Sequence, residues 1–202
     1  FGHWTRTGHG GYGHAYSKTA VMLFNLQYVL GDSLFLDAMR NYFDQWRMCH
    51  PYAEDMRQSF HDFTKVDLNW FFDQWIETDK RIDYAVKGVK NRHRSAGQEI
   101  HLKRIGDLQM PIDLRVIAKD GKVHDFHIPN TWFVKRTDAT VLPKWTGFDD
   151  LRRDYIAHID VPTGIEQVTI DPTNRLGDAY KVNDHLAPPI DVTFDHHIRN
   201  LP

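Results

Sequence analysis

Cysteine is almost absent from this chain. Cys49 is the single cysteine among 202 residues, which excludes an internal disulfide and a zinc centre built from several thiolates. Charge of one sign is not in excess either, because the formal net charge is -2 with histidine neutral. This balance argues against nucleic acid as a partner, since a nucleic-acid-binding domain carries a basic surplus. No run approaches the roughly 18 consecutive apolar residues of a membrane-spanning helix, so no membrane span is expected.

The chain also lacks the features of a natural amino terminus. It begins Phe1-Gly2-His3-Trp4, without an initiator methionine, a basic leader or an apolar leader segment. We therefore expect a processed or truncated product of a longer protein. A single cysteine fits the cytoplasm and does not exclude the periplasm. The compartment stays open, with a periplasmic or secreted location slightly favoured, and so does the oligomeric state.

The composition that is present, 41% hydrophobic and 26% charged, is that of a globular protein with one large or two small domains. In residues 14–78 apolar side chains recur at helical spacing and predict four helices, at about 14–30, 33–48, 53–63 and from Asp67 onward. Gly31 is expected to end the first helix, and Asp32 or Ser33 to cap the second. The side chains predicted to point inward are Tyr16, Ala20, Leu23, Leu26, Val29 and Leu30 on the first helix, Leu36, Met39, Tyr42 or Phe43, and Trp46 on the second, Met56, Phe60 and Phe63 on the third, and Leu68, Phe71, Phe72 and Trp75 on the fourth.

The pattern changes near residues 79–82. Apolar and polar residues then alternate, as in half-buried strands, around 82–86, 100–102, 112–118, 123–128, 134–136, 155–161 and 168–171. Asp120-Gly121 lies between two of these runs and is a strong hairpin signal. About seven short strands over roughly 110 residues suit an immunoglobulin-like β-sandwich. The predicted fold class is α+β, with a helical part at residues 1–80 and a β-sandwich domain at residues 81–202.

One segment has the residues for a catalytic role. Gly8, Gly10, Gly11 and Gly13 precede Tyr16-Ser17-Lys18, and the first predicted helix follows directly. A tyrosine at the start of a helix, after a flexible backbone, can present its phenol to a site. The alternative is that Tyr16 is an ordinary aromatic residue packed against Trp4 or Ala20. Lys18 is expected to pair with a carboxylate and hold its helix in place.

Several landmarks occur in the order seen in a known family of enzymes. They are Tyr16-Ser17-Lys18, Leu30-Gly31-Asp32 before Phe35, His50-Pro51-Tyr52-Ala53-Glu54-Asp55, Asp67-Leu68-Asn69-Trp70-Phe71-Phe72-Asp73-Gln74-Trp75, and Ile82-Asp83-Tyr84. With these landmarks the chain resembles the zinc metallopeptidases of the aminopeptidase N type, which carry HExxH and a distant Glu. The resemblance runs from Tyr16 to about Val89. Beyond that it persists only as the expected β-sandwich.

The resemblance implies a fold and a chemistry. It implies that residues 1–80 are the carboxy-terminal part of a thermolysin-like catalytic domain, in which two His and one Glu hold zinc and a second Glu is the base. It also implies that Tyr16 donates a hydrogen bond to the oxyanion formed when an amino-terminal residue is cleaved from a peptide substrate. No residue of this chain is assigned to cofactor or metal binding.

The metal motif of the family is absent from the sequence. No His is followed by Glu, and none of the 13 His residues lies four positions from another. In the family the zinc ligands precede the tyrosine helix, so they are expected upstream of Phe1, in a missing amino-terminal part that would also be a partner of this chain. The fragment alone is therefore expected to be inactive.

Two other interpretations stay open. The parent protein can have lost its zinc site and serve as a peptidase-like binding or scaffold protein. Alternatively, these residues can be a free-standing interaction module made of helices and a sandwich. The sequence directly upstream would separate the first of these from an active peptidase, because HExxH and a later Glu would be present only in the latter.

Overall fold

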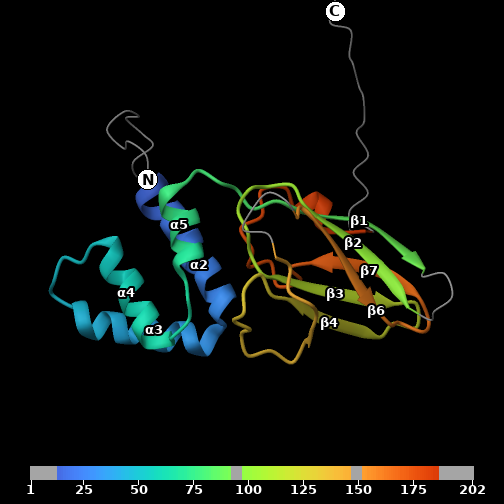
Figure 1. Cartoon of the computed structure of the whole chain (residues 1–202), viewed down its shortest axis with the longest axis horizontal. Helices are drawn as coiled ribbons and strands as arrows, with labels where there is room; N and C mark the ends of the chain where they lie inside the picture. The colour runs from blue at the N-terminus through green and yellow to red at the C-terminus, as the bar shows by residue number, and fades with distance from the viewer. Residues whose placement is uncertain (1–12, 92–96, 147–151, 187–202) are drawn as a thin grey trace, which may run out of the picture.

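The helical part of the chain forms as predicted in number and order. The computed structural model describes residues 13–91, 97–146 and 152–186, and all structural statements concern these. The π-helix η1 (Gly13–Lys18) leads into α2 (Thr19–Leu30), followed by α3 (Asp32–Trp46), α4 (Ala53–Thr64) and α5 (Asn69–Glu77). Figure 1 shows these helices gathered at one end of the molecule, with the sheets at the other. The α+β fold class is confirmed.

The inward faces of the first two helices differ from the prediction. On α2 the buried residues are Met22, Asn25, Leu26, Tyr28, Val29 and Leu30. Tyr16 and Ala20 were expected inside but are exposed. On α3 the buried residues are Phe35 and Ala38, whereas Leu36 and Phe43 face outward. Both helices expose some large apolar residues beside their buried ones (Val21 and Phe24 on α2, Leu36 and Phe43 on α3), so periodicity alone did not select the buried faces.

The junction between α2 and α3 is a single glycine. Gly31 has φ +81°, a conformation that favours glycine, and its N–H donates to the carbonyl of Gln27. The prediction that Gly31 ends α2 is confirmed. The prediction that Asp32 or Ser33 caps α3 is wrong, because Gly31 itself is the N-cap and α3 begins at Asp32. The Asp32 carboxylate accepts instead from Gln27 Nε2 (3.0 Å) and Arg175 Nη2 (2.5 Å).

Aromatic rings form the core of the helical part. Phe60, Phe71 and Phe72 are fully buried, as the sequence predicted. Phe71 meets Phe72 edge to face at 5.7 Å between ring centroids, and Phe60 meets Phe72 at 6.5 Å. Edge-to-face pairs at these separations add to the stabilisation from burial. Phe63 on α4, predicted inward, is partly exposed.

The strands form two sheets. One has the order β1 (Tyr84–Asn91), β2 (Gln98–Arg104), β6 (Asp154–Ile159), and all its pairs are antiparallel. The other has the order β5 (Thr140–Val141), β4 (Val123–Ile128), β3 (Ile112–Ala118), β7 (Ile165–Ile170), with β5 parallel to β4. The β3–β4 hairpin turns at Asp120-Gly121, as predicted, with Gly121 at φ +80°. A 3-10 helix, η2 (Lys181–Asp184), follows β7.

The strand predicted at 134–136 is wrong. These residues lie in an irregular segment between β4 and β5. Lys135 leaves this segment to form an ion pair with Asp113 on β3, so its side chain is directed into the protein and away from a strand ladder. β5, which was not predicted, has two residues, too few for an alternating pattern to be visible in the sequence.

The two sheets and the helices share one core. Buried residues of β2 and β6 (Ile100, Leu102, Ala157), of β3 and β7 (Leu114, Val116, Val168, Ile170) and of α2 and α5 belong to the same hydrophobic cluster. The two sheets therefore pack as a β-sandwich, and the helical layer continues its core. The division into domains at 1–80 and 81–202 stays a prediction. Within the described part of the chain, no helix has the length and apolarity to cross a membrane.

The passage from helices to sandwich depends on a close backbone approach at Gly106. The N–H groups of Ile105 and Gly106 both donate to Asp83 O, and a Cβ atom at position 106 would collide with Arg81 O and lie 2.7 Å from Asp83 N. We expect Gly106→Ala to lower the free energy of unfolding by about 1–3 kcal/mol, because backbone atoms cannot move aside as side chains can.

Urea unfolding measures this cost, and Gly121→Ala is its control. Position 121 has open space for a Cβ atom but a left-handed backbone, so its cost isolates backbone strain. If Gly106→Ala lowers the free energy of unfolding by no more than Gly121→Ala does, the collision at position 106 is not destabilising.

Candidate active site

Tyr16 lies on η1, at the start of the first helical segment. Its side chain is 68% exposed, so the phenol is open to solvent. A π-helical turn is rare and often occurs at functional sites, because it displaces the side chains around it from regular helical positions. Gly8, Gly10 and Gly11, which precede Tyr16 in the sequence, and Trp4, its alternative packing partner, lie outside the described residues.

Tyr16 begins an exposed row of side chains. Tyr16, Ala20 and Phe24 follow one another at intervals of four residues, which places them on one face of the η1–α2 helix. All three are exposed, and Phe24 is 60% exposed. The opposite face of α2 carries Leu26 and Val29 into the core. The helix therefore has two apolar faces, of which one is covered within the described structure.

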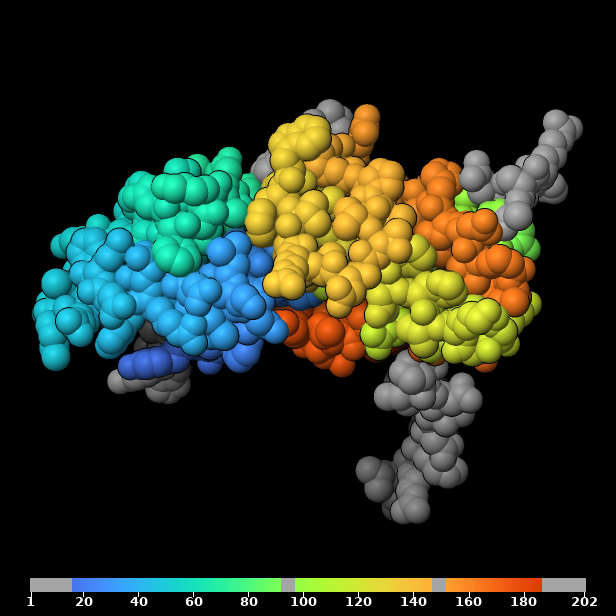
Figure 2. All heavy atoms as spheres, turned by 90° about the horizontal axis from the view of Figure 1, so that it is seen from below, coloured from blue at the N-terminus to red at the C-terminus, as the bar shows by residue number. Residues whose placement is uncertain are grey.

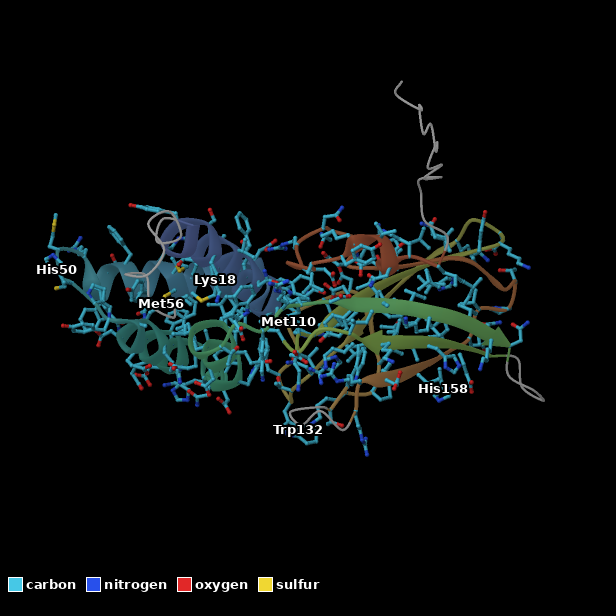
Figure 3. The ribbon with its side chains drawn as sticks, turned by 90° about the horizontal axis from the view of Figure 1, so that it is seen from above. Lys18, His50, Met56, Met110, Trp132 and His158 are labelled. Atoms are coloured by element: carbon cyan, nitrogen blue, oxygen red, sulfur yellow. The ribbon has the colours of Figure 1, made fainter. Side chains whose placement is uncertain are left out.

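A cleft adjoins this helix on the side of the sandwich. It has a volume of ≈ 570 Å³ and is lined by Ser17, Lys18, Val21, Trp75, Lys80, Arg81, Ile82, Leu108, Gly177 and Ala179. Lys18, labelled in Figure 3, donates from Nζ to the carbonyl of Thr78 at 3.4 Å. Lys18 thus joins its helix to the end of α5 through a backbone carbonyl, and the carboxylate partner expected for it stays a prediction. Ser17 and Lys18, which follow Tyr16 directly, form one wall of this opening.

A second cleft lies where α3 meets the irregular segment after β4. Figure 2 shows the blue helices and the yellow segment meeting near the middle of one face. The cleft has a volume of ≈ 600 Å³ and is lined by Leu30, Gly31, Asp32, Ser33, Leu34, Asp37, Phe133, Arg136, Thr137 and Asp138. Tyr16 is not among these residues, so this cleft is separate from the tyrosine.

The residues of the described structure do not fit the zinc ion that the resemblance implies. Among residues 13–91, 97–146 and 152–186, no group of three His, Cys, Asp or Glu side chains could hold a metal ion. Tyr16 is the one site residue predicted from the sequence, and within these ranges no set of metal ligands accompanies it.

Sequence reasoning missed an ionic cluster that joins the helices to the sandwich. Asp113 on β3 accepts from Lys135 Nζ (2.6 Å) and lies 2.7 Å from the Nδ1 atom of His127 on β4. Lys135 Nζ also donates to the carbonyl of Tyr28 (3.0 Å) and lies 4.0 Å from the centre of that ring. The Tyr28 hydroxyl accepts from the backbone N–H of Asp113 (2.7 Å). The four residues come from α2, β3, β4 and an irregular segment, so no local sequence motif predicts that they lie close together.

The charges of this cluster compensate one another. Burial alone would raise the pKa of Asp113, but the His127 hydrogen bond and the charge and hydrogen bond of Lys135 outweigh it, and the pKa lies below its usual value. Burial, with the nearby charges of Asp113 and Asp171, raises the pKa of Tyr28 well above its usual value. The cluster is therefore an ionised aspartate held by a lysine, beside a neutral phenol. His127 is 1% exposed within this cluster.

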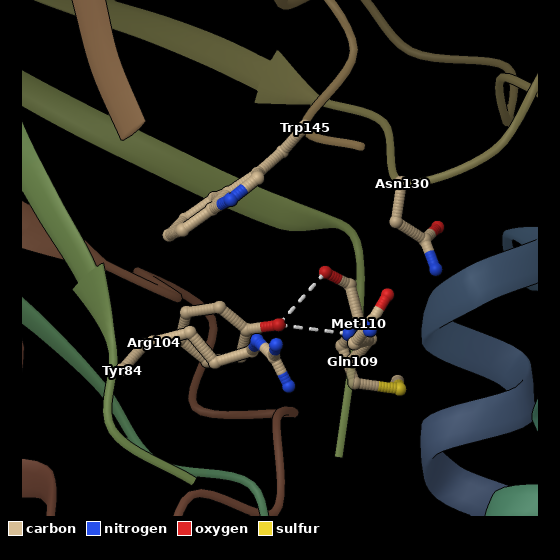
Figure 4. A pocket seen from close by; sticks show the side chains of 6 residues that line it. All are labelled: Tyr84, Arg104, Gln109, Met110, Asn130 and Trp145. Atoms are coloured by element: carbon tan, nitrogen blue, oxygen red, sulfur yellow. Dashed lines mark hydrogen bonds between the residues drawn. The ribbon is translucent and has the colours of Figure 1, made fainter. Parts of the chain in front are cut away.

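Another buried polar group lies between the sheets. Tyr84 on β1 accepts a hydrogen bond from Met110 N–H (2.9 Å) and donates one to Met110 O (3.3 Å), as Figure 4 shows. The adjoining cavity, of ≈ 10 Å³, is lined by Tyr84, Arg104, Gln109, Met110, Asn130 and Trp145. This volume suits at most one water molecule. The group therefore serves packing and not substrate binding.

The helices and the sandwich define an α+β protein. Residues 12–75 match the Peptidase family M1 domain. The resemblance to the zinc aminopeptidases, predicted from landmarks beginning at Tyr16, is thereby confirmed for this stretch. No curated protein matches the chain.

A solved structure shares the fold over most of the chain. It is the aminopeptidase A of Legionella pneumophila, in complex with aspartic acid, at 14% sequence identity and a TM-score of 0.54. The alignment covers 78% of this chain and 16% of the Legionella protein. The chain thus corresponds to about a sixth of that structure, and the likeness concerns the fold.

Proposed function

We propose that this chain is part of a zinc-dependent aminopeptidase, in which the Tyr16 hydroxyl stabilises the oxyanion formed during cleavage of a peptide's amino-terminal residue. The observation that carries the proposal is the position of Tyr16. It is a solvent-exposed phenol at the start of the first helix of the stretch that matches the peptidase family. A phenol buried in the core at this position would have argued against the role.

The chemistry requires a donor at this point. When a nucleophile attacks a peptide carbonyl, negative charge develops on the carbonyl oxygen. A hydroxyl group already directed at that oxygen stabilises the transition state more than the substrate, and so lowers the barrier. The zinc ligands and the general base of such an enzyme would lie outside the described residues, on the rest of the same protein. The fragment alone would then hydrolyse nothing.

The test is Tyr16→Phe in the longer protein that contains this chain. Removal of one oxyanion donor is expected to lower kcat by about a hundredfold or more, equal to about 3 kcal/mol in barrier, with little change in KM. The readout is steady-state turnover of aminoacyl substrates.

Tyr180→Phe is the matched control, because it removes the hydroxyl of another exposed tyrosine, outside the matched stretch. It should leave turnover unchanged. A loss of less than about threefold in Tyr16→Phe would remove Tyr16 from the reaction. A longer protein with no turnover at all, in its natural sequence, would favour a non-catalytic binding or scaffold protein.

The proposed location is periplasmic or secreted, which fractionation of the source cells tests.

A further inference from the structure

Asp184, on η2, is a buried carboxyl group that the proposed peptidase chemistry does not use. The residue is 3% exposed, and within the described chain its Oδ1 atom is buried without a hydrogen-bond partner. An ionised carboxylate in such a place costs far more free energy than a neutral acid, because the buried Oδ1 atom loses its hydration without gaining a donor. The surroundings of Asp184 therefore favour its protonated form.

The carboxylates near Asp184 accept hydrogen bonds from backbone or side-chain donors. Asp178, Asp171 and Asp83 all act electrostatically on Asp184. Asp171 accepts from the N–H groups of Leu176 and Arg175 and from the Thr173 hydroxyl, Asp178 accepts from the N–H groups of Tyr84 and Tyr180, and Asp83 accepts from the amide of Asn183. Hydrogen bonds of this kind stabilise the ionised form, although burial still raises the pKa of Asp178 above its usual value. Of the four acidic residues, Asp184 is thus the one best suited to keep a proton.

Lys181 is the nearby cation, and it is directed at other groups. Its Nζ atom lies 3.3 Å from Asn174 Oδ1 and 3.7 Å from Asp171 Oδ2. Burial and the charge of Asp178 raise the pKa of Asp184 to about 8, with smaller contributions from Asp171 and Asp83 and with Lys181 opposing the rise. His185 is neutral at such a pH, because burial and Lys181 lower its pKa.

Asp184 lies in the middle of a segment that joins the two sheets. In the 178–186 segment, the N–H of Ala179 donates to Ile82 O (2.9 Å), just before β1. At the other end the N–H of Leu186 donates to Val168 O (3.1 Å) on β7, and His185 pairs with Thr169. Between these points η2 packs against β1, as Figure 1 shows near the start of that strand. The segment therefore closes the side of the sandwich between β1 and β7.

We propose that Asp184 is a proton-dependent latch, which holds the 178–186 segment on the sandwich while it is protonated and favours release of the segment from β7 when its proton passes to solvent. Release would leave the β7 edge without the pairing that His185 and Leu186 supply. An uncovered strand edge presents unpaired N–H and C=O groups that can bind another strand. The proposal does not rest on the peptidase activity.

The linkage between proton and segment sets a pH range. A released Asp184 would have the ordinary pKa of an aspartate, about 4. Between about pH 4 and 8 the released state binds fewer protons than the docked state, so the docked state is most favoured at the low end of this range. The equilibrium constant for release should rise about tenfold per pH unit across the range and level off above it.

Hydrogen exchange at the Leu186 amide measures this release in the 202-residue chain. Exchange chemistry itself accelerates about tenfold per pH unit, so an amide protected by the latch should exchange about a hundredfold faster per unit between pH 5 and 8. Asp184→Asn keeps a neutral side chain of the same size. In this variant the exchange rate of the Leu186 amide should rise only about tenfold per pH unit. Asp160→Asn, which changes an exposed aspartate after β6, should keep the hundredfold slope.

A second measurement keeps the proposal testable should Asp184→Asn fail to fold. Carbon-13 NMR of the Asp184 carboxyl in the unchanged protein should show a midpoint well above pH 6. A midpoint near pH 4 would overturn the proposal, as would a tenfold slope at Leu186 in the unchanged protein.

Discussion

Replacement of Asp113 by alanine is expected to lower the free energy of unfolding by about 3–5 kcal/mol, the cost of removing one partner from a buried ion pair. The variant leaves the Lys135 ammonium, which is largely buried, without its carboxylate, and leaves the enclosed ring of His127 without its partner. It also weakens the contact between α2 and β3, because Lys135 is held between Asp113 and the carbonyl of Tyr28. Urea unfolding at pH 7 measures the loss.

Asp125→Ala is the matched control on the same hairpin. Asp125 forms a two-point ion pair with Arg115 (2.8 and 2.9 Å), but this pair is partly exposed, and such pairs contribute about 0–1 kcal/mol. If Asp113→Ala costs no more than Asp125→Ala, the buried cluster does not hold the helices on the sandwich.

The cost of losing Asp113 should depend on pH. Because the pKa of Asp113 is lowered in the folded protein, its contribution is present above the unfolded value of about 4 and is lost as the pH falls through the folded value. The difference between the natural chain and Asp113→Ala should therefore shrink in acid and stay constant between pH 6 and 8.

Phe72→Ala is expected to cost a similar amount, about 3–5 kcal/mol, because it empties a ring-sized volume in the aromatic core. The ring of Phe72 is fully buried between Phe60 and Phe71, and the Arg57 guanidinium lies 5.7 Å from its centre. These neighbours come from α4 and α5, two elements that cannot close the space without moving apart from the rest of the core. The measurement is again urea unfolding.

Phe43→Ala provides the comparison for Phe72→Ala. Phe43 is 64% exposed on α3, so its removal should change stability by no more than about 0.5 kcal/mol. Equal costs at the two positions would mean that α5 does not form the centre of the helical core. Apolar periodicity predicts Phe72 inward and offers Phe43 as an alternative to Tyr42, so this pair of variants also tests how far periodicity identifies buried residues.

Helix and strand positions were largely predictable, because they depend on local spacing. The helices at 53–64 and 69–77 and the hairpin at Asp120-Gly121 follow from apolar periodicity and turn chemistry alone. The buried face of α2 was not predictable, because Val21 and Phe24, which are exposed, are apolar like the buried Leu26. Only the position of the sheets relative to the helix decides which of them is covered.

The candidate site, like the helices, was predictable only in part. Tyr16 could be singled out from its neighbours Ser17 and Lys18 and from the glycines before it, and the order of the landmarks up to Tyr84 indicated the family. Its exposure could not be predicted, and neither could the clefts beside the helices, since each is lined by segments that are far apart in the chain, such as 30–37 and 133–138 in the second cleft.

By itself, the sequence determined the order of the helices and of most strands, the aromatic core and the family resemblance, because these depend on residues close together in the chain. Only the tertiary structure decided that Asp113, His127 and Lys135 meet under Tyr28, and that Asp184 is enclosed among other carboxylates. The reason is physical: burial and charge pairing are properties of neighbours in space, and the residues that act on Asp184 lie as far apart in the chain as Asp83 and Lys181.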